Sequence, residues 1–151
     1  MKLPTKKRLR EIADRLWSLT IRDDWGYCCA VCKRTPVEAH HLIPRQWYAT
    51  RYDLRNGIAL CCRCHKFDAA ISPHLNAAAW MAWLRVHQCT RHQWVTMSIA
   101  TNEHKAQVSK TATYFTDVIR SLKEYVAEDE YRKIVGVRLA ERLDAEDKSN
   151  G

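Results

Sequence analysis

The sequence has little that would place the protein in a membrane or send it out of the cell. It has no apolar run that approaches the roughly 20 residues of a membrane span. Its N-terminal MKLPTKKRLREIADRLW is basic but has no apolar signal-peptide core. Internal repeats and low-complexity linkers are also lacking. We therefore expect a cytoplasmic protein without a membrane partner. Its 151 residues are enough for one domain with at most one appendage.

Seven cysteines are present, an odd number with several members at short spacing. Cytoplasmic thiols stay reduced, so this pattern favours a metal over disulfides. The segments Cys29-Ala-Val-Cys32 and Cys61-Cys-Arg-Cys64 are two Cys-x-x-Cys pairs, and each can form a tight knuckle. Four thiolates complete a tetrahedral zinc site. We predict a structural zinc on Cys29, Cys32, Cys61 and Cys64; a set of buried free thiols is the alternative.

The other cysteines are not expected to bind this zinc. Cys28 and Cys62 have the wrong spacing for a knuckle, and Cys89 is expected to be a small buried apolar residue. His87 to His92, HQCTRH, has no partner cluster and is interpreted as an ordinary helix end and loop. A zinc ion held by four thiolates has no open position. It would therefore stabilise a fold too small to bury enough apolar surface alone.

The excess positive charge lies in one half of the chain. Residues 1–66 hold 14 Lys and Arg against 6 Asp and Glu, whereas residues 67–151 hold 11 of each. The basic half also contains the clustered cysteines and the paired histidines. A polyanion, most commonly nucleic acid, is the partner that this distribution favours; a solvated basic surface is the alternative.

The pattern of apolar residues predicts an α+β protein with a short β-containing middle between helices. Thr5 can cap a helix with apolar residues at helical spacing from Leu9 to Trp17. Short strands and turns follow from Tyr27 to Leu60, with a tight turn at Asn56-Gly57. One helix is expected to start within residues 64–70. Further helices are expected to cover residues 72–87, 113–130 and, more weakly, 131–151. Residues 93–100 are compatible with a strand or a further helical turn.

Two adjacent histidines lie in the short apolar stretch VEAHHLIPR, Val37 to Arg45. Neighbouring residues on a strand point to opposite faces. The two imidazoles therefore cannot have the same function. We expect one to face a metal or the core, and the other to have a different environment.

The order Cys-x-x-Cys, Ala-His-His-Leu-Ile-Pro-Arg, Asn-Gly and Cys-x-x-Cys-His resembles the HNH nuclease family, from Cys29 to about Ala69. Asn56 follows His40 by sixteen residues, and His65 follows Asn56 by nine. The resemblance implies a ββα-metal, treble-clef-like core stapled by the four-cysteine zinc. It implies that His40 and His65 bind a catalytic divalent ion, that His41 is the general base and that Asn56 holds the loop. The expected segments are an N-terminal helix at 1–26, the nuclease motif at 27–72 and a helical extension at 73–151.

The implied chemistry is hydrolysis of DNA phosphodiester bonds, for which histidine is a suitable base near neutral pH. A divalent cation would offset charge on the phosphate. Some family members have a further histidine four residues after the helix histidine, but here that position is Ala69. We therefore expect two protein ligands, which suits Mg²⁺ as well as Mn²⁺ or Ni²⁺. Asp68 is an alternative source of a carboxylate ligand.

Phosphate contacts are predicted for five cations that flank the motif: Arg45, Arg51, Arg55, Arg63 and Lys66. Each of them could instead be a solvated charge. Trp47 and Tyr48 could stack on a base or pack internally.

A second resemblance, on scattered positions in WLRVH…QWV and YFTDVIRSLKEY, is to phage recombination nucleases of the NinG/Rap type. It implies action on branched or single-strand-bearing DNA in the cytoplasm of a bacterial or phage-infected cell. A zinc-stabilised DNA-binding module without catalysis is the alternative. Such a module would not require the spacing of His40, His41, Asn56 and His65.

Overall fold

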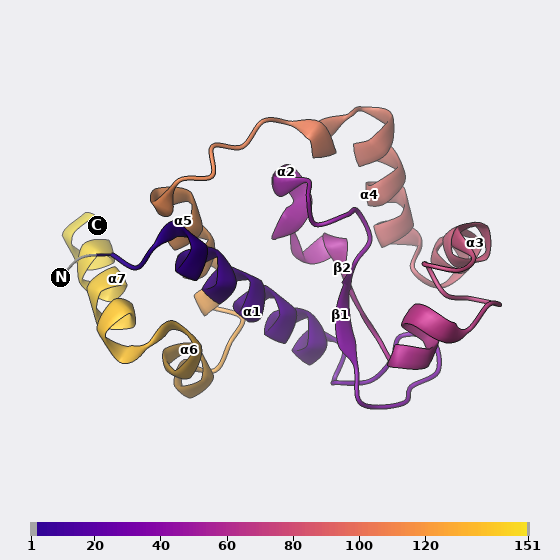
Figure 1. The fold of residues 1–151 in the computed structure, drawn as a ribbon, viewed down its shortest axis with the longest axis horizontal. Coiled ribbons are helices and arrows are strands. Elements are labelled where there is room, and N and C mark those ends of the chain that lie inside the picture. Colours follow the sequence, from indigo (N-terminus) through magenta and orange to yellow (C-terminus); the bar gives the residue numbers. More distant parts are fainter. Residues whose placement is uncertain (1–2, 151) are drawn as a thin grey trace. The chain divides into compact units, whose positions relative to one another are not determined.

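The computed structural model describes residues 3–150, without the side chain of the last of them. The chain forms two compact units. The central unit comprises residues 21–108, and the terminal unit comprises the described parts of residues 1–20 and 109–151. Helix α1 (Lys6–Asp24) begins in the terminal unit and ends in the central one (Figure 1).

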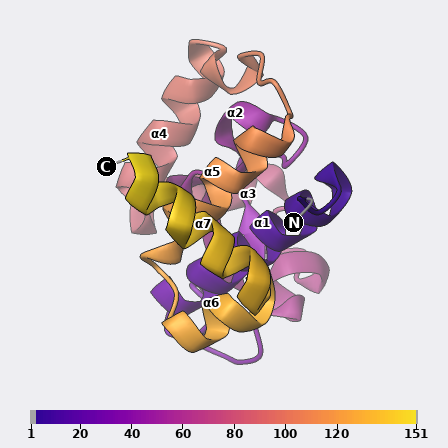
Figure 2. The same ribbon diagram turned by 90° about the vertical axis from the view of Figure 1, so that its left-hand side faces the viewer.

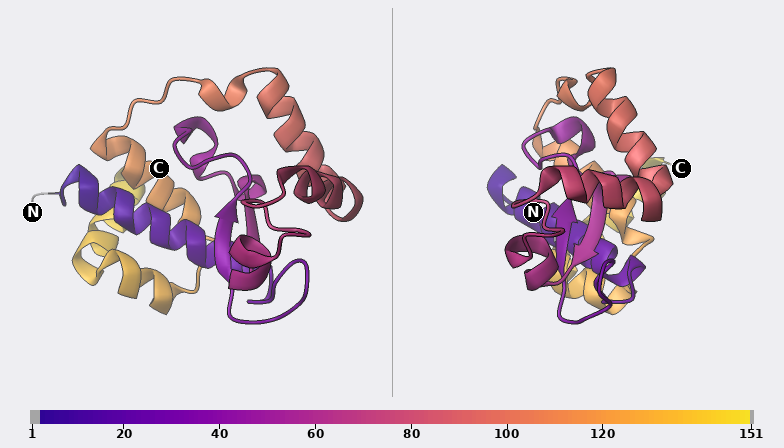
Figure 3. Two further views of the ribbon diagram at one scale, coloured as in Figure 1. Left: turned by 45° about the vertical axis from the view of Figure 1, so that its right-hand side comes forward. Right: turned by 90° about the vertical axis from the view of Figure 1, so that its right-hand side faces the viewer.

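The central unit is built around an antiparallel pair of short strands (Figure 3). Strand β1 (Glu38–His41) pairs with β2 (Gly57–Leu60), so that Glu38 lies opposite Leu60 and His41 lies opposite Gly57. All four residues of β2 are buried. The core of this unit joins the strands, three cysteines and one helix: Cys29, Ala30, Val37, Ile58, Ala59, Leu60, Cys61, Cys64, Trp80 and Leu84.

Short helical turns lie between the two strands and after them, and two longer helices complete the central unit. Between the strands lie α2 (Tyr48–Arg51) and the 3₁₀ turn η1 (Leu54–Asn56). After β2 comes η2 (Arg63–Phe67), a single turn of π-helix. The longer helices are α3 (Ala77–His87) and α4 (Cys89–Ala100), and the 3₁₀ turn η3 (Glu103–Lys105) follows them.

The terminal unit is helical, as Figure 2 shows for the labelled helices α5, α6 and α7. It contains the first part of α1, α5 (Ala112–Lys123), α6 (Glu128–Val135) and α7 (Val137–Asn150). The apolar residues of α1 at positions 9, 12, 13, 16 and 17 are all buried, as their helical spacing predicts.

The α+β class is confirmed, but several predicted boundaries are wrong. The helix predicted at 72–87 begins at Ala77, because the Asn76 side chain caps it by accepting a hydrogen bond from the Ala79 N–H. Residues 93–100 are helical, within α4. The helix predicted at 113–130 ends at Lys123, and α6 begins inside the same range at Glu128. The helix predicted at 131–151 is interrupted at Gly136, which has a φ of +90° and separates α6 from α7. Among the described residues, no helix is long and apolar enough to cross a membrane.

Candidate metal centre and active site

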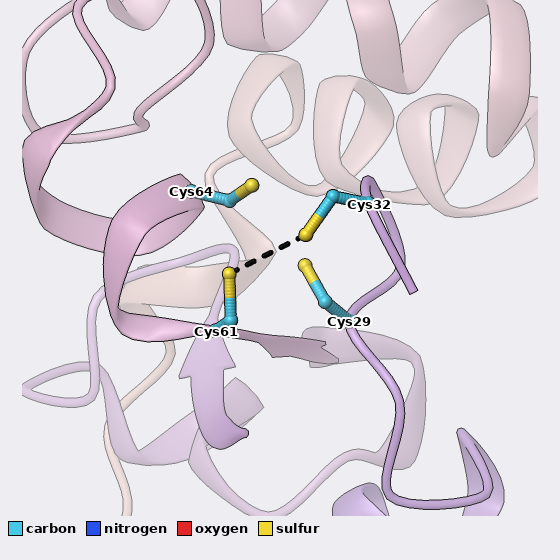
Figure 4. Close-up of side chains that lie close together, drawn as sticks. All are labelled: Cys29, Cys32, Cys61 and Cys64. Carbon is cyan, nitrogen blue, oxygen red and sulfur yellow. Dashed lines mark hydrogen bonds between the residues drawn. The ribbon is translucent and has the colours of Figure 1, made fainter. Parts of the chain in front are cut away.

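The four cysteines of the two Cys-x-x-Cys pairs point toward one another (Figure 4). Their sulfur atoms all lie within 4.8 Å of one another, and the Cys32 and Cys61 sulfurs are 3.5 Å apart. The Lys33 N–H donates to the Cys29 carbonyl, with Lys33 at a φ of +64°. This turn brings both cysteines of the first pair to one point. The arrangement is compatible with the predicted tetrahedral zinc site.

The thiol chemistry of this cluster also fits a metal. Burial raises the pKa of Cys61 and that of Cys64. Burial opposes ionisation of Cys32 as well, but hydrogen bonds from the Arg34 backbone and the neighbouring thiols lower its pKa to about 7. The buried thiols of Cys61 and Cys64 therefore resist ionisation unless a cation binds them. Zinc is the common ion with this preference for thiolates.

Three histidines form a second cluster, which we call the histidine cluster: His40, His65 and His74. The His40 Nδ1 lies 2.9 Å from the His65 Nε2, and the His74 Nε2 lies 3.0 Å from the same atom. Nitrogens that share one metal ion at 2.0–2.1 Å are separated by roughly 3 Å. The donor set therefore fits a divalent ion, with His40 from β1, His65 from η2 and His74 from the loop before α3.

His74 was not predicted from the sequence, which indicated only His40 and His65 as histidine ligands of the catalytic ion. We predicted no third histidine ligand because Ala69 occupies the position of that histidine in some family members. The loop from Asp68 to Asn76 instead places His74 beside His40 and His65. A loop has no periodicity from which the position of His74 could be read. Asp68 is not part of the cluster; its carboxylate lies 3.5 Å from Arg63 and accepts from the Ala70 N–H.

One buried hydroxyl ties this loop to the histidine cluster. Ser72 is fully buried, and its hydroxyl donates to the His65 carbonyl at 2.7 Å. The same oxygen accepts from the His74 N–H at 3.2 Å. A single side chain therefore connects the backbones of His65 and His74.

Glu38 is a second residue that sequence reasoning missed. Its carboxylate lies 2.9 Å from the His65 Nδ1 and 2.8 Å from the Lys66 ammonium. Hydrogen bonds from Lys66 and from His65 lower the Glu38 pKa. The hydrogen-bond network assigns the His65 proton to Nδ1, which leaves Nε2 to face the cluster, as in carboxylate–histidine–metal arrangements. In the sequence, the only sign of this contact is that Glu38 lies two residues before His40.

Burial disfavours the charged form of two members of the histidine cluster, His40 and His65. It lowers the pKa of His65, and with the neighbouring imidazoles it lowers the pKa of His40 to about 3. Neutral imidazole is the form that binds a metal. These two histidines are therefore in the form that accepts an ion near neutral pH.

His41 faces a different environment from His40, as the alternation of a strand predicts. Its Nε2 lies 3.0 Å from the Arg51 carbonyl oxygen, to which it donates. In the neutral ring this hydrogen bond makes Nδ1 the unprotonated nitrogen. The backbone carbonyl therefore orients the His41 ring and leaves Nδ1 as the nitrogen that can accept a proton.

Asn56 is fully buried and closes the loop between the strands. Its side-chain oxygen accepts from the Ile43 N–H at 2.6 Å, and its amide donates to the carbonyls of Ile43 and Thr50, both at 3.0 Å. Thr50 precedes Arg51, whose carbonyl orients His41. Asn56 therefore fixes the segment on which the orientation of His41 depends.

The five predicted phosphate contacts have different environments. Arg51 is buried, donates to the Arg45 carbonyl at 2.6 Å and lies over the Tyr48 ring, so it is not positioned to reach a phosphate. Arg55, Arg63 and Lys66 are exposed but each pairs with a carboxylate. Arg45 is exposed at the edge of the cavity beside the histidine cluster.

Other residues singled out in the sequence have more ordinary positions. Trp47 packs edge-on against the buried His104, which favours the packing alternative for this residue. Cys89 was predicted to be buried, but it is exposed because it is the first residue of α4. His87 and His92 belong to no metal-compatible group among the described residues.

A cavity of about 750 Å³ opens beside the histidine cluster. One wall carries His40, His41, Arg45, His65, Lys66 and His74. The opposite wall is apolar and comes mainly from α3 and α4: Ala77, Trp80, Met81, Leu84 and Val95. The volume lies in the range of pockets that hold small organic groups, roughly 300–1,000 Å³.

Comparison with known proteins gives one match. Residues 29–69 match a family model described as HNH endonuclease. No match was found among the curated proteins or among the solved structures. The matched segment contains both cysteine pairs, His40, His41, Asn56 and His65, and it ends before His74. The family resemblance is confirmed, whereas the NinG/Rap resemblance stays a prediction.

Proposed function

With an HNH endonuclease segment at residues 29–69, we propose that this protein is a metal-dependent endonuclease that hydrolyses DNA phosphodiester bonds. The observation that supports it best is the division between the two adjacent histidines. His40 joins two further imidazoles within 4.8 Å, while His41 is held by a backbone carbonyl beside the same cavity. A module that only binds DNA does not require this division.

In this proposal His40, His65 and His74 hold one divalent ion. When bound, the ion would offset the negative charge that develops on the phosphate and the departing oxygen. His41 accepts the proton of the attacking water at its Nδ1. One phosphorus–oxygen bond forms to that water, and the bond to the departing sugar oxygen breaks. The departing oxygen then takes a proton from solvent.

The surrounding residues keep this arrangement in place. Asn56 holds the segment whose carbonyl orients His41, and Glu38 holds the His65 ring with Nε2 toward the ion. Both act through hydrogen bonds to other residues, so they are positioning residues. Arg45 lines the same cavity, and in this proposal it contacts the phosphate next to the scissile one.

A third imidazole changes the expected metal. Nitrogen ligands favour Mn²⁺, Ni²⁺ or Zn²⁺ over Mg²⁺, which prefers oxygen ligands. The expectation of Mg²⁺ rested on two protein ligands, and His74 weakens it. We therefore expect activity with Mn²⁺ or Ni²⁺ at lower concentrations than with Mg²⁺.

The test is nicking of supercoiled plasmid by wild-type protein with and without added Mn²⁺. His41→Ala should reduce the rate by about 10²–10⁴-fold, as expected for loss of a general base. His92→Ala is the matched control, because this histidine lies on α4 outside the cavity lining. Its rate should stay at the wild-type level. Nicking that His41→Ala leaves unchanged, or wild-type protein that never nicks with any divalent ion, would contradict the proposal.

A further inference from the structure

The loop between the two strands, residues 42–56, is held by elements that lie beyond the segment matched by the HNH family model. Helix α4 contacts this region at two points: the Arg55 guanidinium lies over the Trp94 ring at 5.0 Å, and Arg91 donates to the Gly57 carbonyl at 3.2 Å. The 3₁₀ turn η3 packs against α2 at a third point. The part of the loop that orients His41 is therefore supported from the C-terminal side of the central unit.

His104, in η3, is the buried side chain at this third point. Its Nδ1 donates to the Ser98 carbonyl at 3.0 Å. The chain leaves the helical path here, because Asn102 has a φ of +58° and its N–H donates to the Ile99 carbonyl. The last carbonyls of a helix need donors from outside it. The imidazole supplies one for Ser98, which fixes the ring at the end of α4.

The fixed ring meets the loop at Trp47, the residue that precedes α2. The two ring centroids lie 5.3 Å apart, with planes at 84°. The Trp47 carbonyl accepts from the Thr50 N–H at 3.2 Å and from the Thr50 hydroxyl at 3.3 Å. The next residue is Arg51, whose carbonyl accepts from His41 at 3.0 Å. A continuous series of contacts therefore leads from the end of α4 to the proposed base.

We propose that His104 is a positioning residue for His41. Through Trp47 it holds α2 in the place from which the Arg51 carbonyl orients the His41 ring. An imidazole suits this role because it donates to the Ser98 carbonyl and also presents a ring to Trp47. The proposal deepens the proposed function, and its effect on the rate rests on that function. The orientation of the His41 ring can be measured without it.

The kinetic test is nicking of supercoiled plasmid with Mn²⁺ by His104→Ala. The maximal rate should fall by about ten-fold, because a small displacement of a catalytic group is costly. The KM for DNA and the Mn²⁺ affinity should stay within about two-fold of wild type, because His104 contacts neither the cavity nor the histidine cluster. His92→Ala, on α4 outside the cavity lining, is the matched control and should keep the wild-type rate. An unchanged maximal rate in His104→Ala, or a loss confined to Mn²⁺ affinity, would overturn the proposal.

A double-mutant comparison separates positioning from a general loss of stability. In a His41→Ala background, His104→Ala should cause no further loss of rate, because the base that it orients is absent. A loss of the same size in both backgrounds would overturn the proposal. If His104→Ala does not fold, His104→Phe serves in the same comparison, since it keeps a ring beside Trp47 but cannot donate to Ser98. It should slow nicking when His41 is present and have no effect when His41 is absent.

Nitrogen-15 NMR of the labelled histidine side chains provides a measurement that does not depend on catalysis. In the wild type the His41 proton should lie on Nε2, held by the Arg51 carbonyl. In His104→Ala the two neutral tautomers of His41 should mix, whereas His92→Ala should keep the wild-type signal. The His41→Ala spectrum assigns the resonance.

The two measurements separate this proposal from the nuclease proposal. If wild-type protein nicks no DNA but His104→Ala changes the His41 tautomer, the nuclease proposal fails and the positioning role remains. If wild-type protein nicks DNA with Mn²⁺ but His104→Ala changes neither the rate nor the tautomer, the positioning role is wrong and the nuclease proposal remains.

Discussion

The central unit contains two clusters of metal-compatible side chains that differ in almost every chemical property. The cysteine cluster consists of four thiols, three of them buried, and none of them lines the cavity beside the histidine cluster. The histidine cluster consists of three imidazoles at the wall of a cavity of about 750 Å³. Four thiolates complete the coordination of an ion, whereas three imidazoles leave positions for water and phosphate. From this comparison we propose that the first cluster provides stability and the second provides the chemistry.

The largest effect should follow from breaking the cysteine cluster. Cys64→Ser removes a ligand that is also part of the hydrophobic core, so the central unit should lose its zinc and its cooperative folding. Circular dichroism melting and elemental analysis measure this. Cys62→Ser is the control, since this neighbouring cysteine is exposed and outside the cluster, and it should keep both. A Cys64→Ser protein that melts normally without zinc would show that the cluster does not hold the fold.

Asn56→Ala should have the next largest effect. It leaves the Ile43 N–H and the carbonyls of Ile43 and Thr50 without their buried partner, at a cost of about 1–3 kcal/mol for each unpaired group. The loop that orients His41 would loosen, so nicking should be slower than wild type but faster than in His41→Ala. Melting temperature should fall while zinc content stays at one per chain. Wild-type nicking in this variant would mean that the loop does not orient the base.

Ser72→Ala tests whether the loop delivers His74 to the histidine cluster. Loss of the hydroxyl should weaken Mn²⁺ binding by about 10–100-fold, the usual effect of a residue that orients a metal ligand. Ser98→Ala removes an equally buried serine on α4 and should leave the affinity unchanged. In a His74→Ala background, Ser72→Ala should have little further effect, because both changes act through the same ligand. Additive losses would give Ser72 a separate role.

Glu38→Gln should have the smallest effect. The amide can still accept from the His65 Nδ1 but without the charge of the carboxylate, so Mn²⁺ affinity should fall by about ten-fold or less. Calorimetric titration measures this, and the cysteine cluster supplies an internal control, because its zinc content should not change. A loss as large as that of His65→Ala would mean that Glu38 contacts the ion itself.

The two clusters also differ in how much of each could be predicted from the sequence. Cys29 and Cys32, like Cys61 and Cys64, are local pairs, and their spacing predicts a common turn directly. His40 and His41 could be assigned different environments because strand alternation is a local rule. His74 could not be predicted, because it reaches the histidine cluster through an irregular loop held by Ser72.

Charge was the least predictable property. Composition located the excess of basic residues in the first half of the chain, but it could not show which of them are neutralised. Arg51 is buried and donates to the Arg45 carbonyl, and Arg63 lies beside Asp68. Both facts depend on tertiary contacts that no local pattern encodes. The same holds for Trp47, whose partner His104 is far away in sequence.

The most direct test of the nuclease account is calorimetric Mn²⁺ titration combined with plasmid nicking on two variants, His41→Ala and His74→Ala. The account predicts that His41→Ala binds Mn²⁺ like the wild type and nicks about 10²–10⁴-fold more slowly. His74→Ala should bind Mn²⁺ more weakly and recover nicking as Mn²⁺ is raised. If His41→Ala instead lost the ion while His74→Ala kept both ion and rate, the assignment of base and ligands would be contradicted.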